Sequence, residues 1–304
     1  MTELIELTRV DASPRVTRAD RLLAVRRRLA TVRLDAVVGA GIVGFFALCA
    51  IAPGLIASAD PLASPVNGLT DTGEPKAPGQ DGFWLGTDVI GRDHWSRIVH
   101  GARVAMILAT VPNLLALAIA VVIGLTAGYC RGWVEIVLMR ITETLLVLPV
   151  FLIAMAVIAT FGASVTTLVL TLALVSWSYP ARIVHAEVTR LRSSLHVEAA
   201  VTLGAGGWRV ATRHILPHLR PLLMVYFTMN AAFMVLLEAG LGFLGFGVQP
   251  PTPSWGAMLA DSRDQFFHPW LIIVPGVCLA LLGAGFYLVG QGFRRSNDSD
   301  RVAL

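Results

Sequence analysis

The chain is poor in charge and nearly devoid of lysine. Of its 304 residues 14% are charged, against about 25% in soluble domains, and Lys76 is the only lysine. A phosphate-binding loop of the form GxxxxGK[ST] requires a lysine followed by Ser or Thr, whereas an alanine follows Lys76. The chain therefore has no such loop, and any ATP must be hydrolysed by a different polypeptide.

Cysteine is equally scarce. Cys49, Cys130 and Cys278 lie far apart, within or at the edge of apolar runs, and none has CxxC or Cys/His spacing. This pattern argues against a disulfide framework and against a metal site. The formal net charge of +4 comes from arginines placed beside apolar runs rather than in one basic stripe, which argues against nucleic-acid binding.

Long apolar runs are what the chain has in abundance. Hydrophobic residues make up 55% of it, and the mean hydropathy is +0.70. A helix of about 20 apolar residues crosses the roughly 30 Å hydrocarbon core of a bilayer. We predict an all-α polytopic membrane protein with six transmembrane helices, at about 35–58, 104–130, 140–161 (with a kink at Pro149), 165–183, 222–246 and 271–293.

The distribution of arginine predicts the topology. Residues 1–34 carry eight positive and four negative side chains, and residues 182–220 carry six and two, whereas residues 59–103 carry four and six. Positive charge collects on the cytoplasmic side of membrane proteins. We therefore expect 1–34 and 294–304 to be cytoplasmic segments, so that both termini lie inside, and 59–101 to be an extracellular loop.

That loop is expected to close with an amphipathic helix over about 84–103. Thr87 or Asp88 is placed to cap it, and Asp93 and Arg97 have the spacing of a helical ion pair. By physics alone, a helix lying on lipid headgroups explains this stretch.

The most informative polar stretch is residues 198–217, EAAVTLGAGGWRVATRHILP. Propensity predicts one helix over 187–203, a break at Gly204, Gly206 and Gly207, and a short helix over 208–216 that ends at Pro217. The product is a helix-turn-helix between two spans. Its small residues would let another protein approach, and Glu198 would offer that protein a charge.

Two carboxylates, Glu143 and Glu238, fall inside predicted spans. An ionised carboxylate there costs on the order of 2.5–3.5 kcal/mol. Either group could line a translocation path and contact the amino terminus of a peptide. Alternatively, each hydrogen-bonds within the helix bundle, as Glu143 could near Arg140.

Three segments carry a family resemblance. Residues 198–217 resemble the EAA loop of bacterial ABC-importer permeases, with His218 where an Asn commonly follows the Leu-Pro pair. Residues 85–103, LGTDVIGRDHWSRIVHGAR, and 250–259, PPTPSWGAML, resemble segments of the C-type permeases of dipeptide, oligopeptide and nickel importers. The resemblance implies a type I ABC importer permease fold with its core over 102–293. It also implies that the cytoplasmic coupling loop, 187–217, docks on an ATPase through Glu198, Ala199, Ala200, Gly204, His214, Leu216 and Pro217.

The resemblance also implies what such a subunit assembles with. It would be a non-catalytic subunit in the bacterial plasma membrane, paired with a second, homologous permease. Two ATPase subunits would hold ATP and Mg, so that this chain binds no cofactor, and an extracytoplasmic solute-binding protein would deliver di- or oligopeptides. Nickel, haem and glutathione stay open as cargo. An ATP-independent secondary transporter is the alternative of a different class, although such proteins usually show broken or charged helices near the midplane.

Overall fold

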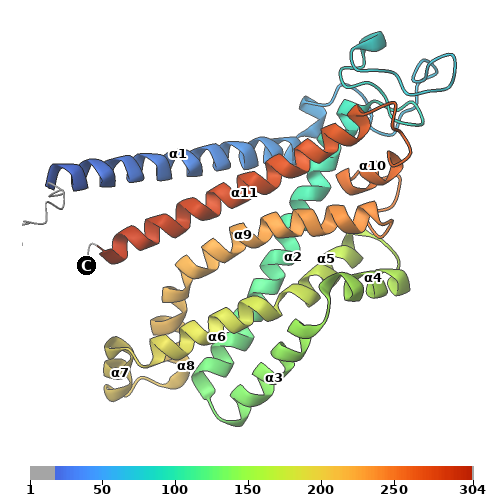
Figure 1. Ribbon diagram of the computed structural model, residues 1–304. Coiled ribbons are helices and arrows are strands. Elements are labelled where there is room, and N and C mark those ends of the chain that lie inside the picture. The colour runs from blue at the N-terminus through green and yellow to red at the C-terminus, as the bar shows by residue number, and fades with distance from the viewer. Residues whose placement is uncertain (1–17, 303–304) are drawn as a thin grey trace, which may run out of the picture.

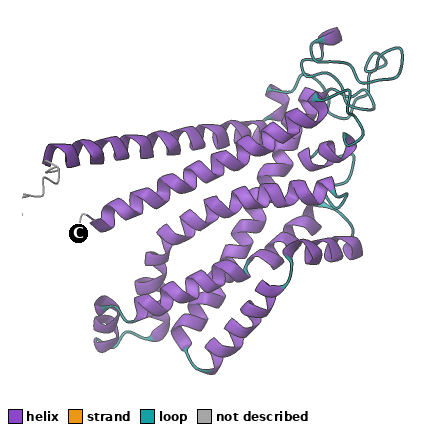
Figure 2. Cartoon of the chain, viewed as in Figure 1, coloured by secondary structure: helices purple, strands orange, loops and turns teal. Residues whose placement is uncertain are grey.

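The computed structural model describes residues 18–302, which consist of helices and connecting loops (Figure 2). Within that range the β-type pairing is limited to two isolated bridges, Leu69 with Pro75 and Thr87 with Asp93. Four helices are long and apolar enough to cross a membrane, or up to six if each of two bent helix pairs counts as one span. The predicted all-α class and the multiple apolar helices are confirmed.

The long helices form the frame of the molecule. They are α1 (Arg18–Ile51), α2 (His94–Cys130), α9 (Leu216–Phe243) and α11 (Trp270–Val302). Shorter α-helices complete it: α3 (Trp133–Val147), α4 (Val150–Phe161), α5 (Val165–Ser176), α6 (Ser178–Arg192), α7 (Leu195–Thr202), α8 (Gly207–Arg209) and α10 (Trp255–Asp261). Single turns η2 (Pro53–Leu55) and η3 (Gln80–Gly82) lie in the long loop, and η4 (Val210–Ile215) is a π-helix.

The two sides of the molecule differ in what they carry. In Figure 1 the first described turn of α1, the last of α11, and α7 lie on one side, here called the α7 side. The loop 52–93 and α10 lie on the other, here called the α10 side. Helix α11 packs against both α1 and α9, and α2 crosses behind them.

Two of the predicted spans are broken rather than continuous. The run 140–161 divides into α3 and α4, whose axes differ by 87°, and the run 165–183 divides into α5 and α6, at 40°. Pro149, predicted to kink a helix, stands at the N-cap of α4. Pro180 explains the second break, because a proline lacks the N–H that would bond the carbonyl four residues earlier, which belongs to Ser176.

The predicted amphipathic helix over 84–103 is wrong as a separate element. Helix α2 begins at His94 and continues without interruption to Cys130. Asp93, rather than Thr87 or Asp88, caps it by accepting a hydrogen bond from Ser96 N at 3.1 Å. The predicted Asp93–Arg97 pair is also wrong, because Arg97 Nε lies 3.3 Å from Asp88 Oδ2 instead.

A tryptophan anchors the core on the α10 side. Trp255 of α10 is fully buried, and its Nε1 donates to the carbonyl of Ile98 in α2 at 2.9 Å. Its ring packs edge-on against Phe46 of α1, with centroids 5.2 Å apart. This side chain therefore joins three helices that are distant in sequence.

Helices α2 and α6 approach closely at two glycines. A Cβ built on Gly124 would lie 2.7 Å from Val184 Cβ, and one on Gly128 would lie 2.8 Å from Val188 Cβ. Such small-xxx-small spacing is typical of tight helix pairs in membranes. No larger side chain fits here unless the two helices separate.

We therefore expect Gly124→Leu to destabilise the protein by about 1–3 kcal/mol, the usual cost of overpacking. Gly41→Leu in α1 is the matched control, because a Cβ there meets nothing within 4 Å. Thermal unfolding in mild detergent compares the two. Equal melting temperatures would contradict the close packing of α2 and α6.

Candidate functional site

The segment between α6 and α9 protrudes on the α7 side (Figure 1). The continuous helix predicted over 187–203 is wrong, because α6 ends at Arg192 and α7 begins at Leu195. The chain turns at the two serines between them, where Ser194 N donates to the carbonyl of Leu191 at 3.0 Å and Glu198 N donates to that of Ser194 at 3.0 Å. α7 is therefore a separate short helix.

Helix α7 has a buried face and an exposed face. Val197 is 1% exposed and Ala200 8%, and both face the chain's own core. Glu198 and Ala199 are exposed. Of the Ala-Ala pair expected to admit a partner, only Ala199 is therefore at the surface.

Gly204 ends α7 as predicted. Its φ of +84° belongs to the left-handed region, which glycine adopts with little strain. In this geometry Ala205 N donates to the carbonyl of Ala200 at 3.0 Å and Gly204 N to that of Val201 at 2.9 Å. Such paired bonds are a common helix C-terminal motif, and they fix the direction in which the chain leaves α7.

The expected end of the second helix at Pro217 is wrong. α8, η4 and α9 follow one another directly, and Pro217 lies in the first turn of α9, where a missing N–H costs little. The π-helix makes this possible: Leu216 N donates to the carbonyl of Ala211, five residues earlier. A displacement of this segment is therefore coupled to α9 through continuous helix.

The base of the protrusion is tightly packed. Val197 from α7 joins a buried cluster with residues of α6, η4 and α9, namely Val184, Val188, Leu191, Val210, Ile215 and Leu219. His196 of α7 stacks on His218 of α9 with ring centroids 4.9 Å apart. His214, Leu216 and Pro217 are half-buried at this base. The seven predicted coupling residues thus divide between an exposed tip and a packed base.

Polar contacts tie the base to α2. Arg192 donates to the carbonyl of Tyr129 at 2.6 Å, and its guanidinium lies 5.5 Å from the centre of that ring. A cavity of about 550 Å³ opens beside this contact, and it is lined by Arg131, Arg192 and Glu198 among others. Two arginines beside one exposed carboxylate offer a polar surface to a partner.

Large apolar side chains on the protrusion are exposed to solvent, and sequence reasoning did not single them out. Leu203 is 88% exposed, Leu195 84%, Trp208 82% and Val201 51%. Exposed apolar patches on one small region commonly mark protein–protein contact sites. Helical spacing alone does not distinguish them, because Val201 and Leu203 follow Val197 and Ala200 by four and three residues.

The two carboxylates predicted inside spans have different surroundings. The side chain of Glu143 is 53% exposed and pairs with Arg140 at 3.2 Å, the contact anticipated from their spacing. Glu238 is 1% exposed, and its Oε1 has no hydrogen-bond partner among the described residues. Neither Glu143 nor Glu238 lies in the protrusion.

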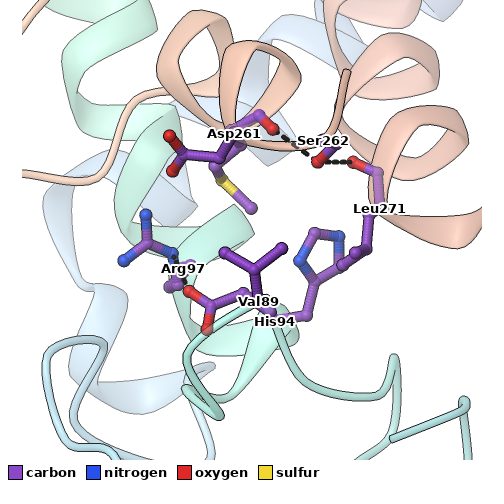
Figure 3. Close-up of a pocket in the computed structure, with 8 residues that line it drawn as sticks. Val89, His94, Arg97, Asp261, Ser262 and Leu271 are labelled. Carbon is purple, nitrogen blue, oxygen red and sulfur yellow. Dashed lines mark hydrogen bonds and ion pairs between the residues drawn. The ribbon is translucent and has the colours of Figure 1, made fainter. Parts of the chain in front are cut away.

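A polar cluster on the α10 side holds the loop 52–93 against α2 and α10. Figure 3 shows Arg97 and Asp261 on one side of a small cavity, and His94 opposite them beside Leu271. Partial burial raises the pKa of the Asp261 carboxyl, with Arg97 and Arg92 opposing that shift. The cavity measures about 10 Å³, close to the least that one water needs, so it is too small for cargo.

These features define a polytopic helical membrane protein that presents a helical protrusion on one side. Comparison with known proteins gives the particular family. Residues 120–297 match the family described as binding-protein-dependent transport system inner membrane component. The chain belongs to this family, which places it in a bacterial membrane as one component of a multi-subunit transport system.

Curated relatives agree with this assignment. The chain is 37% identical to the glutathione transport system permease protein GsiD of Pectobacterium atrosepticum over 216 residues, 71% of this chain and 72% of the relative. It is 36% identical to the dipeptide transport system permease protein DppC of Alkalihalophilus pseudofirmus over 266 residues, which are 86% of this chain and 85% of the relative. It is also 36% identical to the di/tripeptide transport system permease protein DppC of Pseudomonas aeruginosa over 221 residues, which are 72% of this chain and 73% of the relative.

Proposed function

We propose that this chain is the permease subunit of an ATP-driven importer of di- or oligopeptides. The names of the relatives, which refer to dipeptides, di/tripeptides and glutathione, support a short peptide as cargo. A second, homologous permease would complete the path, and a solute-binding protein would deliver the peptide. Two ATPase subunits would supply the energy, with ATP and Mg held there and not by this chain.

The observation that carries this proposal is the protrusion of α7 and α8. Its exposed apolar side chains and Glu198 would enter a cleft on the ATPase, and its packed base would transmit displacement to α9. A ligand shifts an equilibrium only through differential contacts with two states. In this proposal ATP-driven closure of the ATPase pair moves the protrusion as a rigid body and switches the permease pair between inward-open and outward-open forms.

The proposed topology has six spans with both termini in the cytoplasm, each bent helix pair counting as one span. The arginine-rich segment 182–220 then lies on the inner side together with the first described turn of α1 and the last turn of α11. The loop 52–93 and α10 lie outside, where a binding protein can reach them.

Broken helices bear on the competing class. Secondary transporters often have broken helices near the midplane, and this chain has two bent helix pairs, so the breaks alone do not separate the two classes. Membership of a binding-protein-dependent family favours the ATP-driven importer. A secondary transporter would have no use for a coupling protrusion.

Purification of the chain from its native membrane in mild detergent tests the proposal. An ATPase subunit and a second permease are expected to co-purify, and the complex, reconstituted with its binding protein, is expected to accumulate Ala-Ala only when ATP is present. Uptake of Ala-Ala without ATP, by this chain alone, would instead establish a secondary transporter.

A further inference from the structure

Both helix breaks lie beside the same concave surface. The backbone between α3 and α4 and that between α5 and α6 departs from straight helix within the apolar part of the molecule. In a bilayer, irregular backbone is tolerated only where it is buried in protein or lines a water-filled cavity. The breaks therefore indicate a place where this chain faces something other than lipid.

Two adjoining cavities form that surface, here called the central groove. The first cavity measures about 230 Å³ and is bounded on one side by α9. On its other sides lie the residues at the two breaks, Leu145, Leu146 and Val150 at one and Val175, Ser176 and Ser178 at the other. The second, about 350 Å³, continues along Ile183, Leu222, Val225 and Met229. Both are lined by Tyr179, Tyr226, Asn230 and Phe233.

A hydrogen-bonded amide pair orients Asn230 in the groove. Asn113 in the middle of α2 is fully buried and donates through Nδ2 to the carbonyl of Phe227 at 2.7 Å. Its Oδ1 must then face Asn230, which donates to it through Nδ2 at 2.8 Å. The Oδ1 of Asn230 receives no hydrogen bond from residues 34–294 and is left as an oriented acceptor at the groove.

Aromatic rings line the same groove as Asn230. The rings of Tyr179 and Tyr226 lie 6.1 Å apart at 32°, and the Tyr179 side chain is 57% exposed. None of the residues lining the groove is charged, and none is a histidine or cysteine. Nickel would therefore find no ligand of its preferred imidazole type here. Neither Glu143 nor Glu238 lines the groove.

The groove's chemistry selects among possible occupants. Lipid tails cannot satisfy an amide acceptor or a hydroxyl. A tightly packed partner helix favours small residues, whereas Ser176 and Ser178 are the only small residues that line this groove and the rest are mostly large apolar or aromatic side chains. A short peptide offers free N–H groups for the acceptor and side chains for the rings.

We infer that the central groove is this subunit's contact surface for a short peptide in transit. Asn230 Oδ1 accepts a hydrogen bond from a peptide N–H, and Tyr179 and Tyr226 contact its apolar side chain. This inference rests on the proposed function and assigns cargo contact to residues other than the two membrane carboxylates.

The test uses the reconstituted complex with its binding protein and compares uptake of Ala-Ala and Ala-Phe. Tyr226→Ala and Tyr179→Ala are each expected to lower Ala-Phe uptake at least fivefold and to lower Ala-Ala uptake by a smaller factor. Tyr226→Phe is expected to keep most of the Ala-Phe uptake. The double variant N113V/N230V, which removes the acceptor without leaving a buried amide unpaired, is expected to lower uptake of both peptides. ATP hydrolysis and co-purification of the second permease are expected to be unchanged.

Phe45→Ala is the matched control, because Phe45 is a 50% exposed aromatic of α1 outside the groove. Unchanged uptake and unchanged preference in all the groove variants would overturn the inference. So would loss of the second permease from the purified variants, which would make the groove a subunit interface. Failure of the unsubstituted complex to transport either peptide would instead contradict the proposed function, and the inference with it.

Discussion

Replacing Leu203 by glutamate is expected to reduce ATP-driven uptake at least tenfold while the protein inserts and folds normally. The side chain is 88% exposed, so the chain's own packing loses almost nothing. Burial of a leucine against a partner contributes about 1.5–3 kcal/mol, and each 1.4 kcal/mol corresponds to a factor of ten in affinity. A carboxylate placed in the same contact would lose that contribution and add a desolvation cost.

The measurement is peptide uptake by membrane vesicles, together with the amount of ATPase subunit that co-purifies. Val66→Glu serves as the control, because Val66 is fully exposed on the α10 side. Gly204→Asp, which strains the turn after α7 and adds a charge, is expected to act in the same direction as Leu203→Glu. Wild-type uptake in the Leu203 variant would show that the protrusion does not bind the ATPase.

Asp88→Asn is expected to give the largest loss of stability. Asp88 accepts hydrogen bonds from Ile90 N and Arg92 N, at 3.0 and 2.9 Å, and pairs with Arg92 and Arg97, at 2.6 and 3.3 Å. The Arg97 side chain is only 5% exposed. Asp88→Asn removes the ion-pair partner of this buried cation and leaves Asp261 as a more distant compensating charge. Breaking a buried pair costs about 3–5 kcal/mol, or on the order of 10 °C in melting temperature.

The comparison for this prediction is Asp71→Asn, which changes an exposed carboxylate of the same loop. Surface substitutions away from buried pairs usually change stability by less than about 0.5 kcal/mol, so its melting temperature is expected to stay close to that of the parent. Thermal unfolding of both variants in one detergent gives the answer. Equal melting temperatures for the two would show that the cluster beneath the loop 52–93 does not hold it in place.

The sequence was sufficient for features that depend on local chemistry. Hydropathy alone locates the apolar parts of α2, α9 and α11, whereas the polar first turns of α2 and the polar end of α11 extend beyond the predicted spans. Pro149 and Gly204 also act locally, the first by removing an N–H and the second by adopting a left-handed conformation, and both breaks were predicted.

Features that depend on contacts between distant residues were not predictable. Ala200 is buried because α7 packs against α6 and η4. The Asn113–Asn230 pair joins residues of α2 and α9, which are far apart in the sequence. The π-helix lets the chain pass Pro217 without ending, which propensity does not anticipate. Pro180 was visible in the sequence, but the bend it causes becomes clear only when α5 and α6 are seen on either side of it.

Cysteine labelling in intact cells tests the central claim most directly. In a chain whose native cysteines are replaced by alanine, Val66→Cys is expected to react with a membrane-impermeant maleimide from outside. Leu203→Cys is expected to react only after the cells are permeabilised and peripheral proteins are stripped. Labelling of Leu203→Cys in intact cells would place the protrusion on the outer face and contradict its coupling to a cytoplasmic ATPase.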